Sequence, residues 1–217
     1  MNPTAIPAAI PAKVIRVLIV DDHPLLREGL AAVIEGEPDM TIVAEACDGR
    51  EAIECFREHR PDVTLMDLQM PEMDGVASTA AIRSEWSDAR IVMLTTYRGD
   101  VQALRALKAG ASGYLLKSMV RVNLLEAIRS VHMGRRYIPR EIAVELAAHV
   151  TDEALSAREI EVLKRIAAGG SNKLIASQLF VSEDTVKSHI RNIMSKLSAN
   201  DRTHAVTIAL KRGIIDV

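Results

Sequence analysis

Acidic, hydroxyl and basic side chains stand at the ends of four short apolar runs in the first part of the chain. Asp21 and Asp22 follow VIRVLIV, Asp67 follows VTLM, Thr95 follows IVML, and Lys117 follows GYLL. Three carboxylates at close range repel one another, and a hard divalent cation relieves that repulsion. Lysine and threonine side chains beside the cation would contact phosphoryl oxygens, and phosphoryl transfer needs mainly positioning and charge neutralisation. The set predicts a phosphoryl-accepting site that uses Mg²⁺ (or Mn²⁺), with Asp67 as the nucleophile that forms an aspartyl-phosphate.

These side chains can meet only if their apolar runs are strands that share one edge of a sheet. Strand-like and helix-like patterns alternate through five successive units, which predicts a parallel sheet covered by helices on both faces. In a doubly wound (βα)5 sheet of the flavodoxin-like type, with strand order 2-1-3-4-5, the first and third strands are neighbours and ligands bind at the carboxyl edge. Strands are expected at 14–20, 40–46, 62–66, 91–94 and 113–116, with helices after Pro24 and at 49–59, 74–85, 100–109 and 120–132.

Each of these residues also has an ordinary structural explanation, because acidic residues at strand ends are often turn formers or helix caps. Their placement on four strand ends favours a functional site. His23, beside the acidic pair, is more typical of a loop residue before Pro24 than of a Mg²⁺ ligand, since imidazole suits an oxygen site poorly.

After Gly134 the pattern becomes helical only. Residues 136–153 are expected to form a linker with a short helix, and Ser156 and Glu159 form a capping box at the start of the next segment. In SEDTVKSHIRNIMSKL, apolar residues at helical spacing predict one buried stripe, formed by Val186, Ile190, Ile193 and Leu197. The preceding NKLIASQLF is expected to turn Leu174, Ile175, Ala176 and Leu179 toward the same core.

The short Val181-Ser182 connection between these two segments fits a helix-turn-helix. The polar face of the later helix carries Asp184, Lys187, Ser188 and Arg191, flanked by Thr185, His189, Asn192 and Lys196. An ordinary solvated helix is the alternative for such a face. Short polar side chains beside lysine and arginine suit the major groove of double-stranded DNA, and residues 153–217 hold ten basic and seven acidic side chains.

Length and composition limit the class of protein. The 217 residues allow one large or two small domains, and 48% hydrophobic with 26% charged residues fits a globular protein without a membrane span. Cys47 and Cys55 are expected to be free, buried thiols, because no zinc or redox spacing is present. Residues 1–13 are expected to form a disordered tail and not a signal peptide, since prolines interrupt them and no basic segment precedes them.

The motifs VLIVDDHP, LMDLQMPEMDG, IVMLTTY and GASGYLLKS, in this order, closely resemble the receiver domain of bacterial two-component response regulators over residues 14–135. The resemblance implies that the phosphohistidine of a sensor histidine kinase donates its phosphoryl group to Asp67. It implies Mg²⁺ binding by Asp22, Asp67 and the backbone carbonyl of Gln69, with Asp21 acting through water.

The same resemblance assigns further roles. Thr95 and Tyr114 match the switch pair that reports phosphorylation, and Gln69 and Tyr97 match positions that tune the lifetime of the phosphate. Many receivers have Lys-Pro with a cis bond where this chain has Lys117-Ser118. A cis bond before a residue other than proline costs about 2.5–4 kcal/mol, so none is expected here.

The segment LSAREIEVLKRIAAGGSNKLIASQLFVSEDTVKSHIRNIMSKL resembles the all-α, four-helix LuxR-type helix-turn-helix domain, expected at 154–217. By that resemblance the base-facing side chains are Lys187, Ser188 and Arg191, and those near the DNA backbone are Asn172, Lys173, Thr185, His189, Asn192 and Lys196. The last helix, around Ala205–Leu210, would support dimerisation on half-sites about one turn (~34 Å) apart. Together the two parts resemble a NarL/FixJ-type response regulator: a cytoplasmic transcription factor that is not an enzyme and forms a homodimer on phosphorylation or on DNA.

Two alternatives remain open. A regulator of the same DNA-binding class could be controlled by a small ligand or protein, with an inactive receiver, although the intact acid, threonine and lysine set argues against this. A phosphatase could use Asp67 as its nucleophile, but such a site generally needs a general acid, and none is evident near Met66–Gln69.

Overall fold

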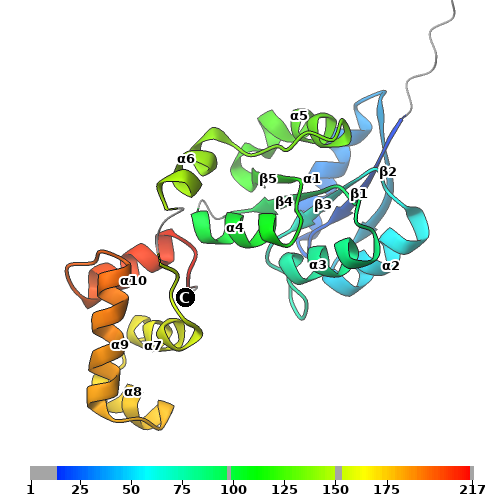
Figure 1. The fold of residues 1–217 in the computed structure, drawn as a ribbon. Helices are drawn as coiled ribbons and strands as arrows, with labels where there is room; N and C mark the ends of the chain where they lie inside the picture. The colour runs from blue at the N-terminus through cyan, green and yellow to red at the C-terminus, as the bar shows by residue number, and fades with distance from the viewer. Residues whose placement is uncertain (1–13, 97–98, 150–152, 216–217) are drawn as a thin grey trace, which may run out of the picture. The chain divides into compact units, whose positions relative to one another are not determined.

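The computed structural model describes residues 14–96, 99–149 and 153–215. The expected N-terminal tail and Tyr97 lie outside these residues. The strands are β1 (Ile15–Val20), β2 (Met40–Ala46), β3 (Val63–Asp67), β4 (Ile91–Thr95) and β5 (Gly113–Leu116). The helices that alternate with them are α1 (Pro24–Glu35), α2 (Gly49–His59), α3 (Gly75–Glu85), α4 (Asp100–Lys108) and α5 (Val120–His132), with a 3-10 turn, η1 (Lys117–Met119), before α5 (Figure 1).

The five strands form one parallel sheet of order β2-β1-β3-β4-β5, which confirms the predicted topology. The strand register places the predicted residues at one edge. Val20 of β1 is paired with Met66 of β3, so the residues that follow, Asp21 and Asp67, stand side by side. Thr95 is paired with Leu116, which puts Lys117 one residue beyond the end of β5.

Helices cover both faces of the sheet, as expected for strands that are apolar throughout (Figure 1). On one face, α1 and α5 pack on the strands through side chains such as Leu30, Ile34, Leu124 and Ile128, each no more than 1% exposed. The helices α2 and α3 contact each other on the opposite face. This two-sided burial fixes the strand ends and therefore the edge where the predicted site residues lie.

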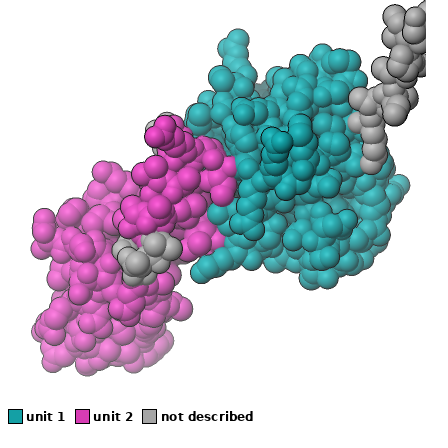
Figure 2. Space-filling model, turned by 45° about the horizontal axis from the view of Figure 1, so that its top comes forward, with its two compact units in different colours: residues 1–95, 106–137 teal, residues 96–105, 138–217 magenta. Residues whose placement is uncertain are grey.

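The described chain separates into two compact units (Figure 2). One comprises residues 1–95 and 106–137, and the other comprises 96–105 and 138–217. The second unit contains α6 (Arg140–Ala148), α7 (Ala157–Ala167), α8 (Asn172–Leu179), α9 (Glu183–Lys196) and α10 (Arg202–Lys211). None of the described helices combines the length and the apolar character that crossing a bilayer requires.

Local signals explain where the helices of the second unit begin. The predicted capping box is present at α7, where the Ser156 hydroxyl accepts the Glu159 N–H and the Glu159 carboxylate accepts the Ser156 N–H. The hydroxyls of Ser171 and Ser182 cap α8 and α9 by accepting the Leu174 and Thr185 N–H groups. Phe180 ends α8 in the left-handed region, with φ 54°, and the chain turns there into α9.

The core of α7 to α10 contains the predicted stripe of α9, but one residue predicted for the core face of α8 lies outside it. Val186, Ile193 and Leu197 are buried, and Ile190 packs against them. Leu174, however, is 50% exposed, so its predicted place in the core is wrong. The core face of α8 is formed by Ile175, Ala176 and Leu179, and Leu174 is rotated about 100° away from Ile175 around the helix axis.

Both cysteines are free, but their predicted burial is wrong. Cys47 is exposed and Cys55 is half-buried. Cys47 lies in the loop after β2, immediately before Asp48, which caps α2. Cys55 lies at the edge of the apolar face of α2, where Ala52 and Phe56 are the buried side chains.

Candidate functional site

The structure brings the acidic residues predicted from the strand ends into one cluster. Asp21, Asp22, His23 and Asp67 each offer one ligand atom, and these atoms all lie within 4.8 Å of one another. Asp21 and Asp67 are buried, at 0% and 2% exposure, whereas Asp22 is only half-buried. Two of the carboxylates are therefore buried at the carboxyl edge of the sheet, and that of Asp22 is partly open to solvent.

Lys117 closes this cluster from β5. Its ammonium lies 2.8 Å from Asp21 Oδ2 and 2.9 Å from Asp67 Oδ2, and its side chain is 13% exposed. His23 lies beside the two aspartates at the end of β1, with its Nδ1 2.7 Å from Asp22 Oδ1 and 3.3 Å from Asp21 Oδ1. One lysine thus faces two buried carboxylates, which leaves the buried part of the site with an excess of negative charge.

The loop after β3 ends at Asp74 and Gly75, where α3 begins. The Asp74 side chain accepts the Ala77 N–H and starts α3. Gly75 lies against the Asp67 backbone, where any Cβ atom would collide with the Asp67 carbonyl oxygen. Glycine at this position therefore lets α3 begin directly beside the carboxylate that the sequence predicts to be the nucleophile.

Burial controls the ionisation of this carboxylate. It raises the pKa of Asp67 to about 6, and the neighbouring Asp21 raises it too, while hydrogen bonds from Lys117 and from the Gln69 backbone N–H oppose the shift. Burial also lowers the pKa of Lys117, but its hydrogen bonds with Asp21 and Asp67 outweigh that effect, so the pKa lies above its usual value. Near neutral pH the lysine is charged, and a second cation would favour the ionised form of Asp67.

Three further residues predicted for this site, Thr95, Tyr114 and Gln69, lie on or beside the strands that end at this edge. Thr95 and Tyr114 are buried, at 1% and 0% exposure, on adjacent strands. The Gln69 backbone is next to the Asp67 carboxyl, as its hydrogen bond shows. The described residues contain no cis peptide bond, as expected for Lys117-Ser118.

Arg27 is a neighbour of this site that the sequence analysis missed. Its guanidinium donates a hydrogen bond of 2.6 Å to the Asp21 carbonyl and pairs with Glu45 at 3.4 Å. The sequence did contain a signal for this contact. Pro24 marks the first turn of α1, so Arg27, three residues later, lies one turn into the helix and close to the end of β1. Arg27 holds the β1–α1 loop that presents Asp21 and Asp22.

The predicted DNA-facing side chains of α9 form an exposed surface. Lys187, Ser188, Arg191 and Asn192 are exposed, and Thr185 and His189 are half-buried. On α8, Lys173 is exposed and Asn172 is half-buried. Lys187 is paired with Asp184 at 2.9 Å on the same helix, a surface ion pair that DNA phosphates would compete with.

Lys196 differs from the other residues predicted to lie near the DNA backbone. Its ammonium lies 3.0 Å from Glu159 and 3.2 Å from Glu153, and its side chain is only 16% exposed. It also donates to the Ala154 carbonyl. Lys196 therefore joins the end of α9 to the capping box of α7, a structural role that its position in the sequence did not indicate.

Comparison with known proteins assigns both parts of the chain. Residues 17–129 match the model of the response regulator receiver domain, and residues 153–209 match that of the bacterial regulatory proteins of the luxR family. The chain belongs to the response regulators with a LuxR-type DNA-binding domain. Relatives of this response regulator are transcriptional regulatory proteins.

Two relatives illustrate how complete the match is. Transcriptional regulatory protein LiaR of Bacillus subtilis is 39% identical over 210 residues, which cover 93% of this response regulator and 100% of LiaR. A probable transcriptional regulatory protein NarL of Mycobacterium tuberculosis is 38% identical over 208 residues, covering 93% and 96% of the two chains. The crystal structure of ChrA, a response regulator of a heme-sensing two-component system, is 40% identical with a TM-score of 0.56, covering 93% of this chain and 99% of ChrA.

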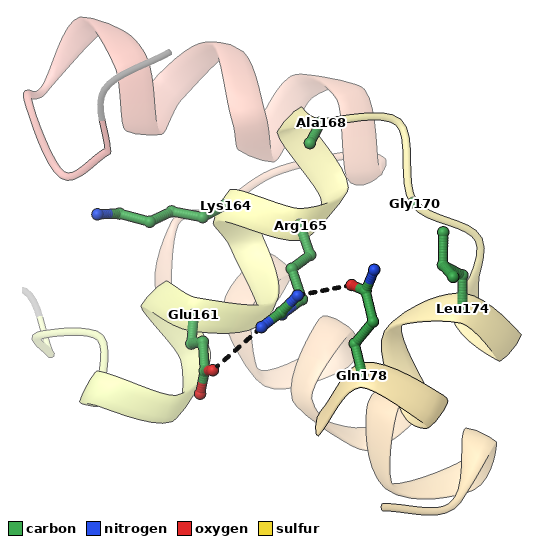
Figure 3. Close-up of a pocket in the computed structure, with 7 residues that line it drawn as sticks. All are labelled: Glu161, Lys164, Arg165, Ala168, Gly170, Leu174 and Gln178. Atoms are coloured by element: carbon green, nitrogen blue, oxygen red, sulfur yellow. Dashed lines mark hydrogen bonds and ion pairs between the residues drawn. The ribbon is translucent and has the colours of Figure 1, made fainter. Parts of the chain in front are cut away.

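A hollow of about 420 Å³ lies between α7 and α8 of this response regulator (Figure 3). Arg165 crosses it, donating to Gln178 at 2.6 Å and pairing with Glu161 at 3.5 Å. The exposed side chain of Leu174 forms part of its lining. Because the Arg165 network joins the two helices across the hollow, it holds α8 in place relative to α7.

Proposed function

We propose that this response regulator is a transcription factor switched by phosphorylation of Asp67. The observation that carries the proposal is the Lys117 ammonium within 2.9 Å of two buried carboxylates, in a cluster whose ligand atoms lie within 4.8 Å of one another. This arrangement concentrates negative charge at an edge of the sheet where a cation and a phosphoryl group would be bound side by side. The phosphoryl donor is the phosphohistidine of a sensor histidine kinase, as the receiver domain implies.

The residues present fit a Mg²⁺ ion. Three aspartates supply hard oxygen donors, and only one lysine balances the two that are buried. We propose that Asp22, Asp67 and the Gln69 carbonyl hold the ion, with Asp21 acting through water. When bound, Mg²⁺ supplies charge neutralisation for the carboxylates and for the incoming phosphoryl oxygens.

The protein's own groups have separate tasks in the transfer. An ionised Asp67 oxygen attacks phosphorus as the bond from phosphorus to the kinase imidazole breaks, and the imidazole departs with that electron pair. The Lys117 ammonium contacts one transferred oxygen, and the Thr95 hydroxyl moves to contact another. Tyr114, on the neighbouring strand, changes position with Thr95. Because Asp67 only accepts and loses a phosphoryl group, with no turnover on an external substrate, we class the protein as a regulator and not as an enzyme.

We assign the receiver to residues 14–135, a linker containing α6 to 136–153, and the DNA-binding domain to 154–217. The exposed polar face of α9 supports a recognition helix in which Lys187, Ser188 and Arg191 face the bases of double-stranded DNA. The side chains proposed to lie near the DNA backbone are Asn172, Lys173, Thr185, His189, Asn192 and, once released from its ion pairs, Lys196. The protein acts as a homodimer through α10 on two half-sites, and as a regulator of bacterial genes it works in the cytoplasm.

A footprinting experiment tests the proposed function. Purified wild-type protein and Asp67→Asn are each incubated with Mg²⁺, with and without acetyl phosphate, and probed on a duplex selected from a random library by the treated wild-type protein. We expect acetyl phosphate to strengthen or extend protection for the wild type only. An equal response of Asp67→Asn would assign the switch to another residue, and no response of either protein would favour a receiver that is not controlled by phosphate.

A further inference from the structure

The chain returns to the open edge of the sheet immediately after α5. Since β5 is the last strand in the sheet order, its outer edge lacks a neighbouring strand. Gly134, with φ +76°, ends α5 and reverses the chain. Tyr137 then lies alongside Gly113 as a parallel bridge, donating its N–H to the Ser112 carbonyl at 3.1 Å.

Tyr137 is also hydrogen-bonded to the backbone of Tyr114, the predicted switch residue. The Tyr114 N–H donates a hydrogen bond of 2.8 Å to the Tyr137 carbonyl. The Tyr114 side chain is completely buried, and its backbone N–H is bound to Tyr137, so a displacement of the Tyr114 backbone would act directly on Tyr137. Tyr137, five residues beyond the end of α5, is therefore hydrogen-bonded directly to β5.

A second attachment joins Tyr137 to α5. The Asn123 side-chain amide donates a hydrogen bond of 2.7 Å to the Tyr137 hydroxyl. The half-buried Tyr137 side chain also packs against the core on the α1 and α5 face of the sheet. Tyr137 is thus held at two points, by its backbone to β5 and by its hydroxyl to the first turn of α5.

Both attachments flank the lysine of the phosphoryl site. Lys117 lies three residues after Tyr114 and six residues before Asn123, and η1 connects it to α5 without an intervening loop. In the unphosphorylated protein its ammonium is held by Asp21 and Asp67. A phosphoryl group on Asp67 adds oxygens next to that ammonium, and a shift of Lys117 is passed along a short stiff segment to both attachments.

We propose that Tyr137 is a positioning residue that transmits the state of Asp67 to the chain leading to the DNA-binding domain. The compact unit that contains the sheet ends at Tyr137, and α6 begins three residues later at Arg140. Tyr137 is therefore the residue at which that unit ends, and its position fixes the starting point of the chain that leads to α6. This inference rests on the proposed function, because it requires Asp67 to carry a phosphoryl group.

The test separates transmission from a purely structural role. Full-length wild type, Tyr137→Phe, Asn123→Ala and the double variant are compared, with Arg136→Ala, an exposed neighbour in the chain, as the control. Two quantities are measured for each: labelling of Asp67 by acetyl phosphate with Mg²⁺, and the ratio of dissociation constants without and with acetyl phosphate. The DNA is the duplex selected by the treated wild-type protein.

We expect labelling to be unchanged in every variant and the affinity ratio to fall by roughly two- to fivefold in Tyr137→Phe, which is the worth of about one hydrogen bond. Asn123→Ala should reduce the ratio similarly and the double variant no further, because both changes remove the same bond. Arg136→Ala should keep the wild-type ratio. Wild-type ratios in Tyr137→Phe and Asn123→Ala, with normal labelling, would overturn the inference alone. Absence of labelling in the wild type would overturn the proposed function and the inference with it.

Discussion

The Lys117 ammonium lies 2.9 Å from Asp67 Oδ2 at the carboxyl edge of the sheet. The same ammonium also serves Asp21, at 2.8 Å, so it is shared between two buried carboxylates. Burial, together with the neighbouring Asp21, outweighs the hydrogen bond from Lys117, so the pKa of Asp67 remains raised even though a lysine is adjacent. A site that is short of positive charge in its resting state is suited to receive a divalent cation.

Removing the shared lysine should destabilise the cation-free receiver. Lys117→Ala leaves Asp21 and Asp67 buried without their cation, so we expect the free energy of unfolding at pH 7.5 in EDTA to fall by about 3 kcal/mol. Lys117→Arg keeps the charge and should lose much less. Urea unfolding measures the effect, with Lys108→Ala, an exposed lysine of α4, as the control. Equal stability of Lys117→Ala and Lys108→Ala would show that the ion pairs contribute nothing net to folding.

Ionisation of Asp67 should make the cation-free protein less stable as the pH rises. Its pKa is about 6 in the folded chain, above the ordinary value of about 3.9, so the folded state binds the proton more tightly than the unfolded state. Between pH 4 and pH 6 the wild type should therefore lose up to about 3 kcal/mol relative to Asp67→Asn, which has no charge to bury. Thermal or urea unfolding in EDTA measures this difference. Parallel pH profiles for the two proteins would contradict the raised pKa, and adding Mg²⁺ at pH 7.5 should reduce the difference.

The exposed cations of α9 should account for part of the salt dependence of DNA binding. Lys187→Ala combined with Arg191→Ala should weaken specific binding and reduce the slope of log K against log salt by about 1 to 2, because each phosphate charge that a bound lysine or arginine neutralises contributes about 0.9. The matched control, Lys108→Ala with Lys164→Ala, removes two exposed lysines outside α8 and α9. An unchanged slope in the α9 variant would remove this helix from the DNA interface.

Lys196 should contribute to stability in a way that the exposed lysines do not. Its Glu159 partner is 3% exposed and belongs to the capping box of α7, and the Ser156 N–H and the Lys196 ammonium hold the pKa of Glu159 below its usual value against the opposing effect of burial. Lys196→Ala should therefore lower the free energy of unfolding, and by more than Lys164→Ala does. Urea unfolding of the full chain distinguishes them, and equal effects would show that the pair at 3.0 Å is screened by solvent.

The sequence predicted what depends on strand order and helix period. Asp21, Asp67, Thr95 and Lys117 could be placed together because parallel strands put all their carboxyl ends at one edge. The buried stripe of α9 followed from its 3.6-residue period. These features are local patterns repeated along the chain, and the structure contains them with boundaries that differ by a residue or two.

What the sequence did not predict depends on contacts between distant segments. Lys196 pairs with a carboxylate 37 residues away, and Tyr137 bonds to the backbone of Ser112 and Tyr114, which no periodicity reveals. Leu174 was placed in the core on residue type alone, although its neighbour Ile175 occupies that face. Cysteine is usually buried, yet Cys47 is exposed, in the loop immediately before Asp48, the N-cap residue of α2.

Chemical location of the phosphoryl group tests the central claim most directly. Protein treated with acetyl phosphate and Mg²⁺ is reduced with borohydride, which converts an aspartyl-phosphate to homoserine, and the modified peptide is sequenced by mass spectrometry. We predict homoserine at position 67, with none formed in EDTA or in Asp67→Asn. Modification at another aspartate, or none in the wild type under conditions where the protein is folded and Mg²⁺ is present, would contradict the account.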